Sequence, residues 1–186
     1  DHVNLAIVKL KIEEDFISNV NFSPDKNFNY IEDEKYRLVF SQMLSITGER
    51  TIQPAIFPPH TYHINTVTSI TFKDESKLLE LSAISSSIVI DFYVKIIGKG
   101  GFYSGSLRKL LLGINKSFIS QLLVRTLLLN SLNQNYKKLW KNNFKEAFTK
   151  DTWSKEDKRL KPFSNLTQEW QWSTPLRNWF ERRQAL

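Results

Sequence analysis

The first half of the chain alternates apolar and polar residues in short runs, a pattern typical of β-strands. The runs that predict strands cover residues 4–12, 35–44, 52–57 and 62–72. In the second run, Tyr36, Leu38 and Phe40 fall on one face. Residues 13–34 are rich in Asn, Asp and Ser, so we expect a polar connection between the first two strands.

The apolar spacing changes after Asp74, where it becomes that of a helix. The segment from Leu78 to Ile97 suits a buried helix or a pair of helices. The β-branched run Ile88-Val89-Ile90 leaves a strand open as the alternative there. A glycine-rich turn, Gly98-Lys99-Gly100-Gly101, ends this segment.

The last third of the chain predicts one long amphipathic helix from about Lys116 to Phe148, because apolar residues recur there at helical spacing. Residues 150–173 follow as an irregular stretch, and we expect its tryptophans to hold it against the rest of the protein. Thr174-Pro175, a capping residue followed by proline, then predicts the start of a final helix.

Together these patterns predict an α+β fold, with a strand-rich N-terminal part followed by helices. We expect the strand-rich part to cover residues 1–113 and a basic helical part to cover residues 114–186. The sequence begins without an initiator Met, and its last predicted helix has no terminating residue. We interpret it as a fragment of a larger protein.

Charge is divided unevenly between the two halves of the chain. Residues 1–98 contain 9 basic and 13 acidic side chains, whereas residues 99–186 contain 17 basic and 6 acidic ones, a net charge of +11. A surface with this excess attracts a polyanion, and nucleic acid is the commonest such partner in the cytosol. Lysines that only keep helices solvated are the alternative.

Composition also disfavours several classes of site. The absence of cysteine excludes disulfides, thiolate nucleophiles and cysteine-ligated zinc, and it favours a cytoplasmic location. The three histidines are too few and wrongly spaced for zinc, so we predict no metal site. No apolar stretch reaches the roughly 18 residues of a membrane span. Because neither a nucleophile elbow nor a phosphate-binding glycine loop is present, we predict no catalytic residue in this chain.

One group of residues imitates a metal-dependent nuclease. Asp25, Asp33 and Lys35 match by type the two acids and lysine with which many nucleases hold a divalent ion. They lie in the most polar, turn-rich stretch, so a solvated acidic loop is our first interpretation. A nuclease is kept as a minor alternative.

Three stretches resemble, in the same order, one family of bacterial enzymes. Thr47-Gly48-Glu49-Arg50-Thr51, followed by Ile56-Phe57-Pro58-Pro59, looks like a turn and strand of that family's specificity region. Residues 79–98 are similar to the helix after that sheet, and residues 127–140 and 170–186 resemble the C-terminal helices. The family is the large adenine-N6 DNA methyltransferases of restriction-modification and DISARM-type phage-defence systems. The likeness covers most of the chain from Lys35 onward.

The resemblance implies that the chain is the target-recognition and C-terminal part of such an enzyme, which binds double-stranded DNA sequence-specifically. The family's catalytic signature, Asn/Asp-Pro-Pro-Tyr/Phe, is replaced by Phe57-Pro58-Pro59-His60, which lacks the acceptor for the adenine amine. A glycine-rich cofactor loop is absent as well. We therefore expect S-adenosylmethionine to bind, and adenine to be methylated, in a domain outside this chain. Leu110–Gly113 also depart from the Leu-Pro pair usual there.

The residues expected to contact DNA are basic or polar ones on turns and helix faces. Arg50 and Thr51 lie on a turn between strands, where a guanidinium can address a guanine or a phosphate, or can pair with Glu49 or another carboxylate. The others lie on or after the glycine-rich turn, or beside the apolar stripe of the long helix. They are Lys99, Ser104, Arg108 and Lys109 in the first group, and Lys137, Lys138, Lys141 and Lys145 in the second.

A second interpretation makes the chain a scaffold that docks other subunits of a defence complex. Its anchors would be four tryptophans, because exposed indoles are common at the centres of protein interfaces. They are Trp153, Trp170, Trp172 and Trp179. Burial of these side chains would weaken this interpretation.

Overall fold

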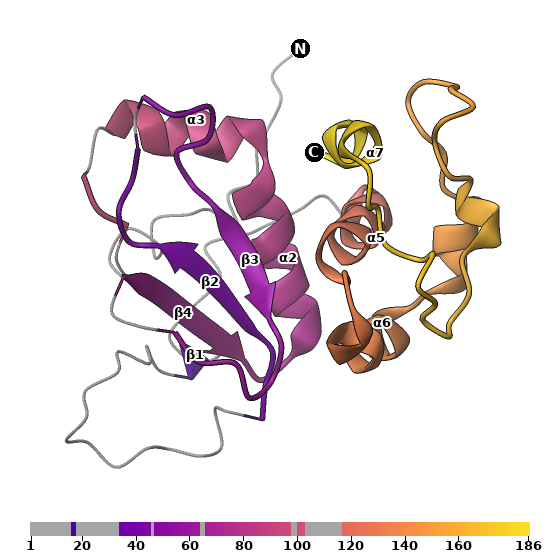
Figure 1. Cartoon of the computed structure of the whole chain (residues 1–186), viewed down its shortest axis with the longest axis horizontal. Coiled ribbons are helices and arrows are strands. Elements are labelled where there is room, and N and C mark those ends of the chain that lie inside the picture. Colours follow the sequence, from indigo (N-terminus) through magenta and orange to yellow (C-terminus); the bar gives the residue numbers. More distant parts are fainter. Residues whose placement is uncertain (1–15, 18–33, 46, 64–65, 98–99, 103–116) are drawn as a thin grey trace.

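A four-stranded antiparallel sheet forms the N-terminal part of the protein (Figure 1). The computed structural model describes residues 16–17, 34–45, 47–63, 66–97, 100–102 and 117–186. The strands are β1 (Phe16–Ile17), β2 (Arg37–Ser41), β3 (Pro54–Phe57) and β4 (Val67–Phe72), in the spatial order β1-β4-β2-β3. The strand expected over residues 4–12, and most of the connection at 13–34, lie outside the described residues.

The central strand β2 sets the register of the sheet. Leu38 lies opposite Ile56 of β3 on one side and Ile70 of β4 on the other, and all three side chains are buried. Tyr36 and Phe40, on the same face of β2, belong to the same core. The three strands predicted at 35–44, 52–57 and 62–72 are therefore confirmed, each shorter than its apolar run.

Two helices follow the sheet, α2 (Glu75–Ser86) and α3 (Ile88–Ile97). Asp74 caps α2 by accepting a hydrogen bond from the Ser76 backbone N–H at 2.8 Å, and bonding to Ser76 lowers the pKa of its carboxyl group. Ser87 separates the helices, and its Oγ accepts from the Ile90 N–H at 3.2 Å. The helix pair is confirmed, and the alternative of a strand at residues 88–90 is wrong.

The expectation that both helices are buried is wrong for α3. Its apolar residues Ile88, Phe92 and Ile96 are 66%, 62% and 67% exposed. Hydrophobicity alone predicts burial but does not identify what would cover the surface. In contrast, α2 packs on the sheet and on the C-terminal helices, with Leu78 and Leu79 buried (Figure 1).

The single long helix predicted from Lys116 to Phe148 is wrong. The chain instead forms α5 (Ile119–Asn130), the 3-10 turn η2 (Gln134–Tyr136), α6 (Lys137–Asn143) and the 3-10 turn η3 (Glu146–Lys150). The α5 helix ends at Ser131, whose backbone dihedral angles (φ −77°, ψ 51°) leave the helical region, and the Asn133 side chain accepts from the Asn135 N–H at 2.9 Å. The Asn133 side chain thus caps the turn η2, and this local bond competes with the helix that the apolar spacing would continue.

The last helix, α7 (Trp179–Ala185), begins later than Thr174-Pro175, so that predicted start is wrong. Asn178 is the N-cap, and its side chain accepts from the Glu181 N–H at 2.8 Å. Thr174, Pro175 and Leu176 form a buried run instead, in which the Leu176 N–H donates to Leu128 O of α5 at 3.0 Å. The short turn η4 (Phe163–Asn165) lies in the preceding irregular stretch.

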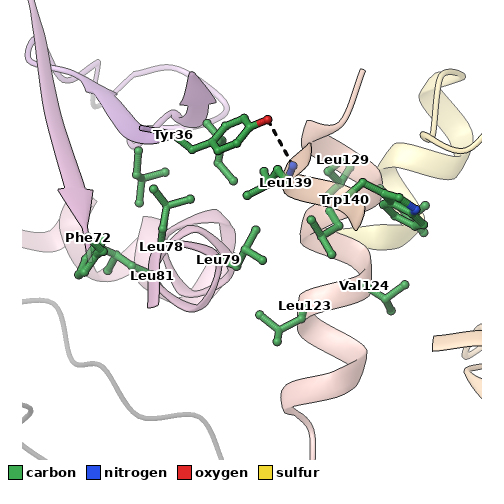
Figure 2. Close-up of a cluster of buried hydrophobic side chains, with 14 of the residues drawn as sticks. Tyr36, Phe72, Leu78, Leu79, Leu81, Leu123, Val124, Leu129, Leu139 and Trp140 are labelled. Atoms are coloured by element: carbon green, nitrogen blue, oxygen red, sulfur yellow. Dashed lines mark hydrogen bonds between the residues drawn. The ribbon is translucent and has the colours of Figure 1, made fainter. Parts of the chain in front are cut away.

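One hydrophobic core joins the strand-rich part to the helical part. Leucines of α2 lie between the sheet and α5 and α6, and Tyr36 points toward Leu139 (Figure 2). The Tyr36 hydroxyl donates to Asn135 O at 2.7 Å, and the Tyr136 hydroxyl donates to Ile56 O at 2.7 Å. Burial raises the pKa of Tyr136 to about 12. The α+β fold with strands first is confirmed, whereas the boundary at 113/114 stays a prediction.

Candidate nucleic-acid interface

The lysine-rich helix α6 is attached to the protein by its inner face. Leu139 and Trp140 are fully buried, and Trp140 Nε1 donates to Thr167 O at 2.9 Å. Because these two side chains face inward, Lys137 and Lys138 at the start of the helix are left in solvent. The same bond brings the irregular stretch after η4 alongside α6.

A row of cationic and aromatic side chains runs from α6 across this stretch. Lys137 Nζ lies 5.6 Å from the centroid of the Trp170 ring, within the range of a cation–π contact. The Trp170 and Trp172 rings meet edge to face, with centroids 6.3 Å apart, and Arg177 Cζ lies 3.8 Å from the Trp172 centroid. We call these four residues the cation–aromatic row.

Backbone carbonyls at the end of α5 hold this row in place. Trp170 Nε1 donates to Ser131 O at 2.9 Å, and Arg177 Nη2 donates to Leu132 O at 2.9 Å. Arg177 Nε also donates to Trp172 O at 2.9 Å. These carbonyls are free of helical partners because α5 ends there, so the helix end that contradicts the predicted long helix also anchors the row.

The charge excess persists on the folded C-terminal part. Residues 117–186 contain 13 basic and 6 acidic side chains, whereas residues 34–97 contain 6 of each. Three of those acids already pair with cations: Asp151 with Arg125, Asp157 with Arg159, and Glu169 with Lys141. Hydrogen bonding to Arg159 holds the pKa of the Asp157 carboxyl well below its usual range.

Several cations have no acidic partner within the described part of the chain. Lys137, Lys138 and Lys145 are exposed there and form no salt bridge to a described residue. Lys141, in contrast, lies 2.6 Å from Glu169 Oε1 in an exposed pair. A wide, open depression of about 990 Å³ along residues 149–164 adds the exposed Lys150, Lys155 and Lys158. These cations are therefore available to phosphates of a bound polyanion.

Arg50 and Thr51 lie in the N-terminal, strand-rich part of the chain, in the turn between β2 and β3. Arg50 Nη2 donates to Ser86 O at 2.6 Å, and its Nε lies 3.6 Å from Asp91 Oδ1. The backbone N–H groups of Thr51 and Ile52 donate to the same Asp91 oxygen, each at 2.8 Å. Arg50 thus pairs with a carboxylate of α3, and Thr51 is buried. Their role in binding DNA stays a prediction.

The remaining expected contacts, Lys99, Ser104, Arg108 and Lys109, lie outside the described residues. Leu110–Gly113 lie outside them too. Sequence reasoning had not singled out Arg177, which completes the row, or Arg183, which lies 4.9 Å from the Trp179 ring centroid. The available signal was the interleaving of tryptophan and arginine between Trp170 and Arg183.

The four tryptophans proposed as scaffold anchors divide into two pairs. Trp153 and Trp170 are partly buried, pack against the core, and donate their indole N–H to Lys161 O and Ser131 O. Trp172 and Trp179 are 67% and 70% exposed. The first pair holds the irregular stretch as expected, and only the second pair is free to contact another molecule.

Metal-ligating residues are not gathered anywhere in the described ranges. These ranges contain no cluster of three or more His, Asp or Glu residues able to hold a metal ion. Asp25 and Asp33 lie outside the described residues, and Lys35 is the one member of the nuclease alternative that lies within them. In the Phe57–His60 segment Pro58 is buried, and His60 has a positive φ of 58°. No side chain there supplies the amide or carboxylate acceptor that methyl transfer to adenine needs.

A small cavity of about 150 Å³ lies beneath the irregular stretch, between Leu128, Trp153, Phe163 and Leu176. Lys161 lines it and donates through Nζ to Ser173 O at 2.9 Å and Pro175 O at 3.0 Å. Ligand pockets are commonly about 300 Å³ or larger. We assign this cavity no ligand.

Comparisons with protein-family models, curated proteins and solved structures found no match to this chain. In the described ranges, every helix is too short or too polar to cross a membrane.

Proposed function

We propose that this chain binds duplex DNA through its basic C-terminal part. The observation that carries the proposal is the concentration of 13 basic against 6 acidic side chains in residues 117–186, with half of the acids already paired to cations. The exposed lysines of α6 and of the open depression supply phosphate contacts, which account for most of the affinity of such proteins.

We further propose that this binding serves target recognition in an adenine-N6 DNA methyltransferase of a cytoplasmic phage-defence system. Support for this finer function is the family resemblance of the sequence. In that enzyme another domain binds S-adenosylmethionine and carries the catalytic residues, and this chain binds the duplex. The chain alone then neither binds the cofactor with useful affinity nor methylates DNA.

The test is a fluorescence anisotropy titration of a labelled duplex between about 50 and 200 mM salt. Six to eight phosphate contacts give a slope of about −5 to −7 in a plot of log affinity against log salt concentration. Changing Lys137 and Lys138 together to Gln should reduce the magnitude of this slope by roughly one for each lost contact. Lys73→Gln is the matched control, because Lys73 is an exposed lysine on the neutral part.

Two outcomes contradict the proposal. One is the absence of duplex binding at the lowest salt concentration. The other is an equal loss in the Lys73 and α6 variants, which would mean that the position of the charge on the surface has no importance.

A scaffold function is the second candidate, and the exposed face of α3 favours it. Phe92 and Ile96 belong to a group of exposed apolar side chains on α3, together with Ile88 and Val89. Phe92→Ser should then abolish assembly with other subunits of the defence complex and leave duplex affinity unchanged. Assembly that survives the change would refute this second function.

A further inference from the structure

Two of the five tryptophans stand apart from the others by their exposure. Trp140 is fully buried, and Trp153 and Trp170 are partly buried with their N–H groups bonded to carbonyls. Trp172 and Trp179 leave about two thirds of their surface in water, at 67% and 70%. Tryptophan is highly buried on average, so two largely exposed indoles in one short segment suggest a surface that contacts a ligand.

Each exposed indole has a guanidinium against its ring. Arg177 Cζ lies 3.8 Å from the Trp172 centroid, and Arg183 Cζ lies 4.9 Å from the Trp179 centroid. Beside this guanidinium each indole still leaves about two thirds of its surface in water, at 67% for Trp172 and 70% for Trp179. Each pair therefore offers open indole surface with a positive charge next to it.

Both pairs are attached to a rigid support. Arg177 is fixed by bonds to two carbonyls, and the buried run at 174–176 between the pairs is bonded to α5 through the Leu176 N–H. Arg182 of α7 donates to Leu129 O at 3.0 Å and to Leu176 O at 3.1 Å, which fixes the helix that carries Trp179. Little side-chain or backbone entropy is then lost when a ligand stacks on these rings.

We propose that Trp172 and Trp179, with Arg177 and Arg183, form a binding site for single-stranded nucleic acid, in which unpaired bases stack on the two indoles. Every base has a π-face that fits a flat indole, and the adjacent guanidinium adds a positive charge that attracts the phosphate backbone. In a duplex both faces of each base are covered by its neighbours, so the indoles contribute only where strands are separated.

The charge around the site favours a nucleic acid over a protein partner. Residues 170–186 contain Arg177, Arg182 and Arg183 against Glu181, which is buried, and Glu169 beside them is paired with Lys141. A protein-docking surface of this chain would more naturally be the exposed apolar side chains of α3. The inference rests on the proposed function, because the lysines of α6 and the open depression supply the phosphate contacts around the two indoles.

The experiment uses the full chain and two labelled probes, an oligothymidylate of about 20 nucleotides and a duplex of the same length. Trp172→Ala and Trp179→Ala should each weaken oligothymidylate binding about 10-fold and change duplex affinity less than about 2-fold. Trp172→Phe, which keeps an aromatic ring, should retain most of the wild-type affinity for the oligothymidylate. Phe92→Ala is the matched control, because it removes an equally exposed aromatic ring from the neutral part. A thermal melt of each variant confirms that it folds.

The outcomes separate this inference from the function on which it rests. Duplex binding with full salt dependence, but no tryptophan effect on the single strand, overturns the inference and leaves the proposed function standing. Loss of affinity for both probes to the same extent also overturns it, because the indoles would then act on the duplex as well. If neither probe binds, both proposals fail. Vesicles of anionic lipid serve as a third probe. If the two tryptophan variants lose binding only to these vesicles, the exposed indoles contact a membrane surface and the inference is wrong.

Discussion

Asp91 of α3 holds the turn between β2 and β3, and we expect its removal to destabilise the sheet strongly. One carboxylate oxygen accepts the backbone N–H groups of Thr51 and Ile52 at 2.8 Å each, in a buried setting. Asp91→Ala leaves two buried donors without an acceptor, and each such donor costs about 1–3 kcal/mol. The expected loss in the free energy of unfolding is about 3 kcal/mol, because some water will reach the vacated space.

Two further variants distinguish this explanation from a simple loss of charge. Asp91→Asn keeps an oxygen acceptor and should lose only about 1 kcal/mol. Arg50→Gln removes the partly exposed cation 3.6 Å away and should also lose less than about 1 kcal/mol. The measurement is urea denaturation followed by tryptophan fluorescence, with the slope m held equal among the variants. The reasoning is refuted if Asp91→Ala costs no more than Asp91→Asn.

Three other variants test the contacts that join the two parts and hold the irregular stretch. Tyr136→Phe removes a hydroxyl bonded to Ile56 O and should cost about 1 kcal/mol at neutral pH. Burial raises the pKa of Tyr136 to about 12, above the unfolded value of about 10. The free energy of unfolding of the wild type should therefore fall as the pH rises from about 10 to about 12. Urea denaturation should show a smaller fall for Tyr136→Phe over the same range. Trp140→Ala should cost about 3–5 kcal/mol, and a thermal melt within a few degrees of wild type would contradict its burial. Arg125→Met removes the ion pair with Asp151, so limited proteolysis should cut residues 150–165 faster than in wild type, and an unchanged rate would show that the pair is dispensable.

The parts of the fold that sequence could predict are those decided by local pattern. The alternation of Tyr36, Leu38 and Phe40 correctly predicted a strand, and the change of spacing after Asp74 correctly predicted helices. The prediction of one long helix was wrong because Leu132 continues the apolar spacing, although the chain leaves the helical conformation at Ser131 and the Asn133 side chain caps a new turn. The prediction that α3 is buried was wrong because the hydrophobicity of a segment favours its burial but does not determine which other segment covers it.

The candidate interface was predictable in its charge and not in its geometry. The count of basic residues predicts a cationic C-terminal part, and the helical spacing places Lys137 beside an apolar stripe. Its contact with Trp170 depends on the bond from Trp140 to Thr167 O, which joins segments 27 residues apart. No local pattern encodes such a contact, and the pairing of Arg50 with Asp91 across 41 positions is of the same kind.

The bonds of Tyr36 have a consequence for how the protein is made. Its hydroxyl donates to Asn135 O, 99 positions later, and accepts from the Leu139 N–H, 103 positions later. Native contacts this distant along a chain form slowly. During translation the sheet and α2 leave the ribosome well before α5 and α6, so the leucines that α2 turns toward these helices stay uncovered until both helices have emerged. A nascent chain in this state exposes leucine side chains to water and is prone to aggregate.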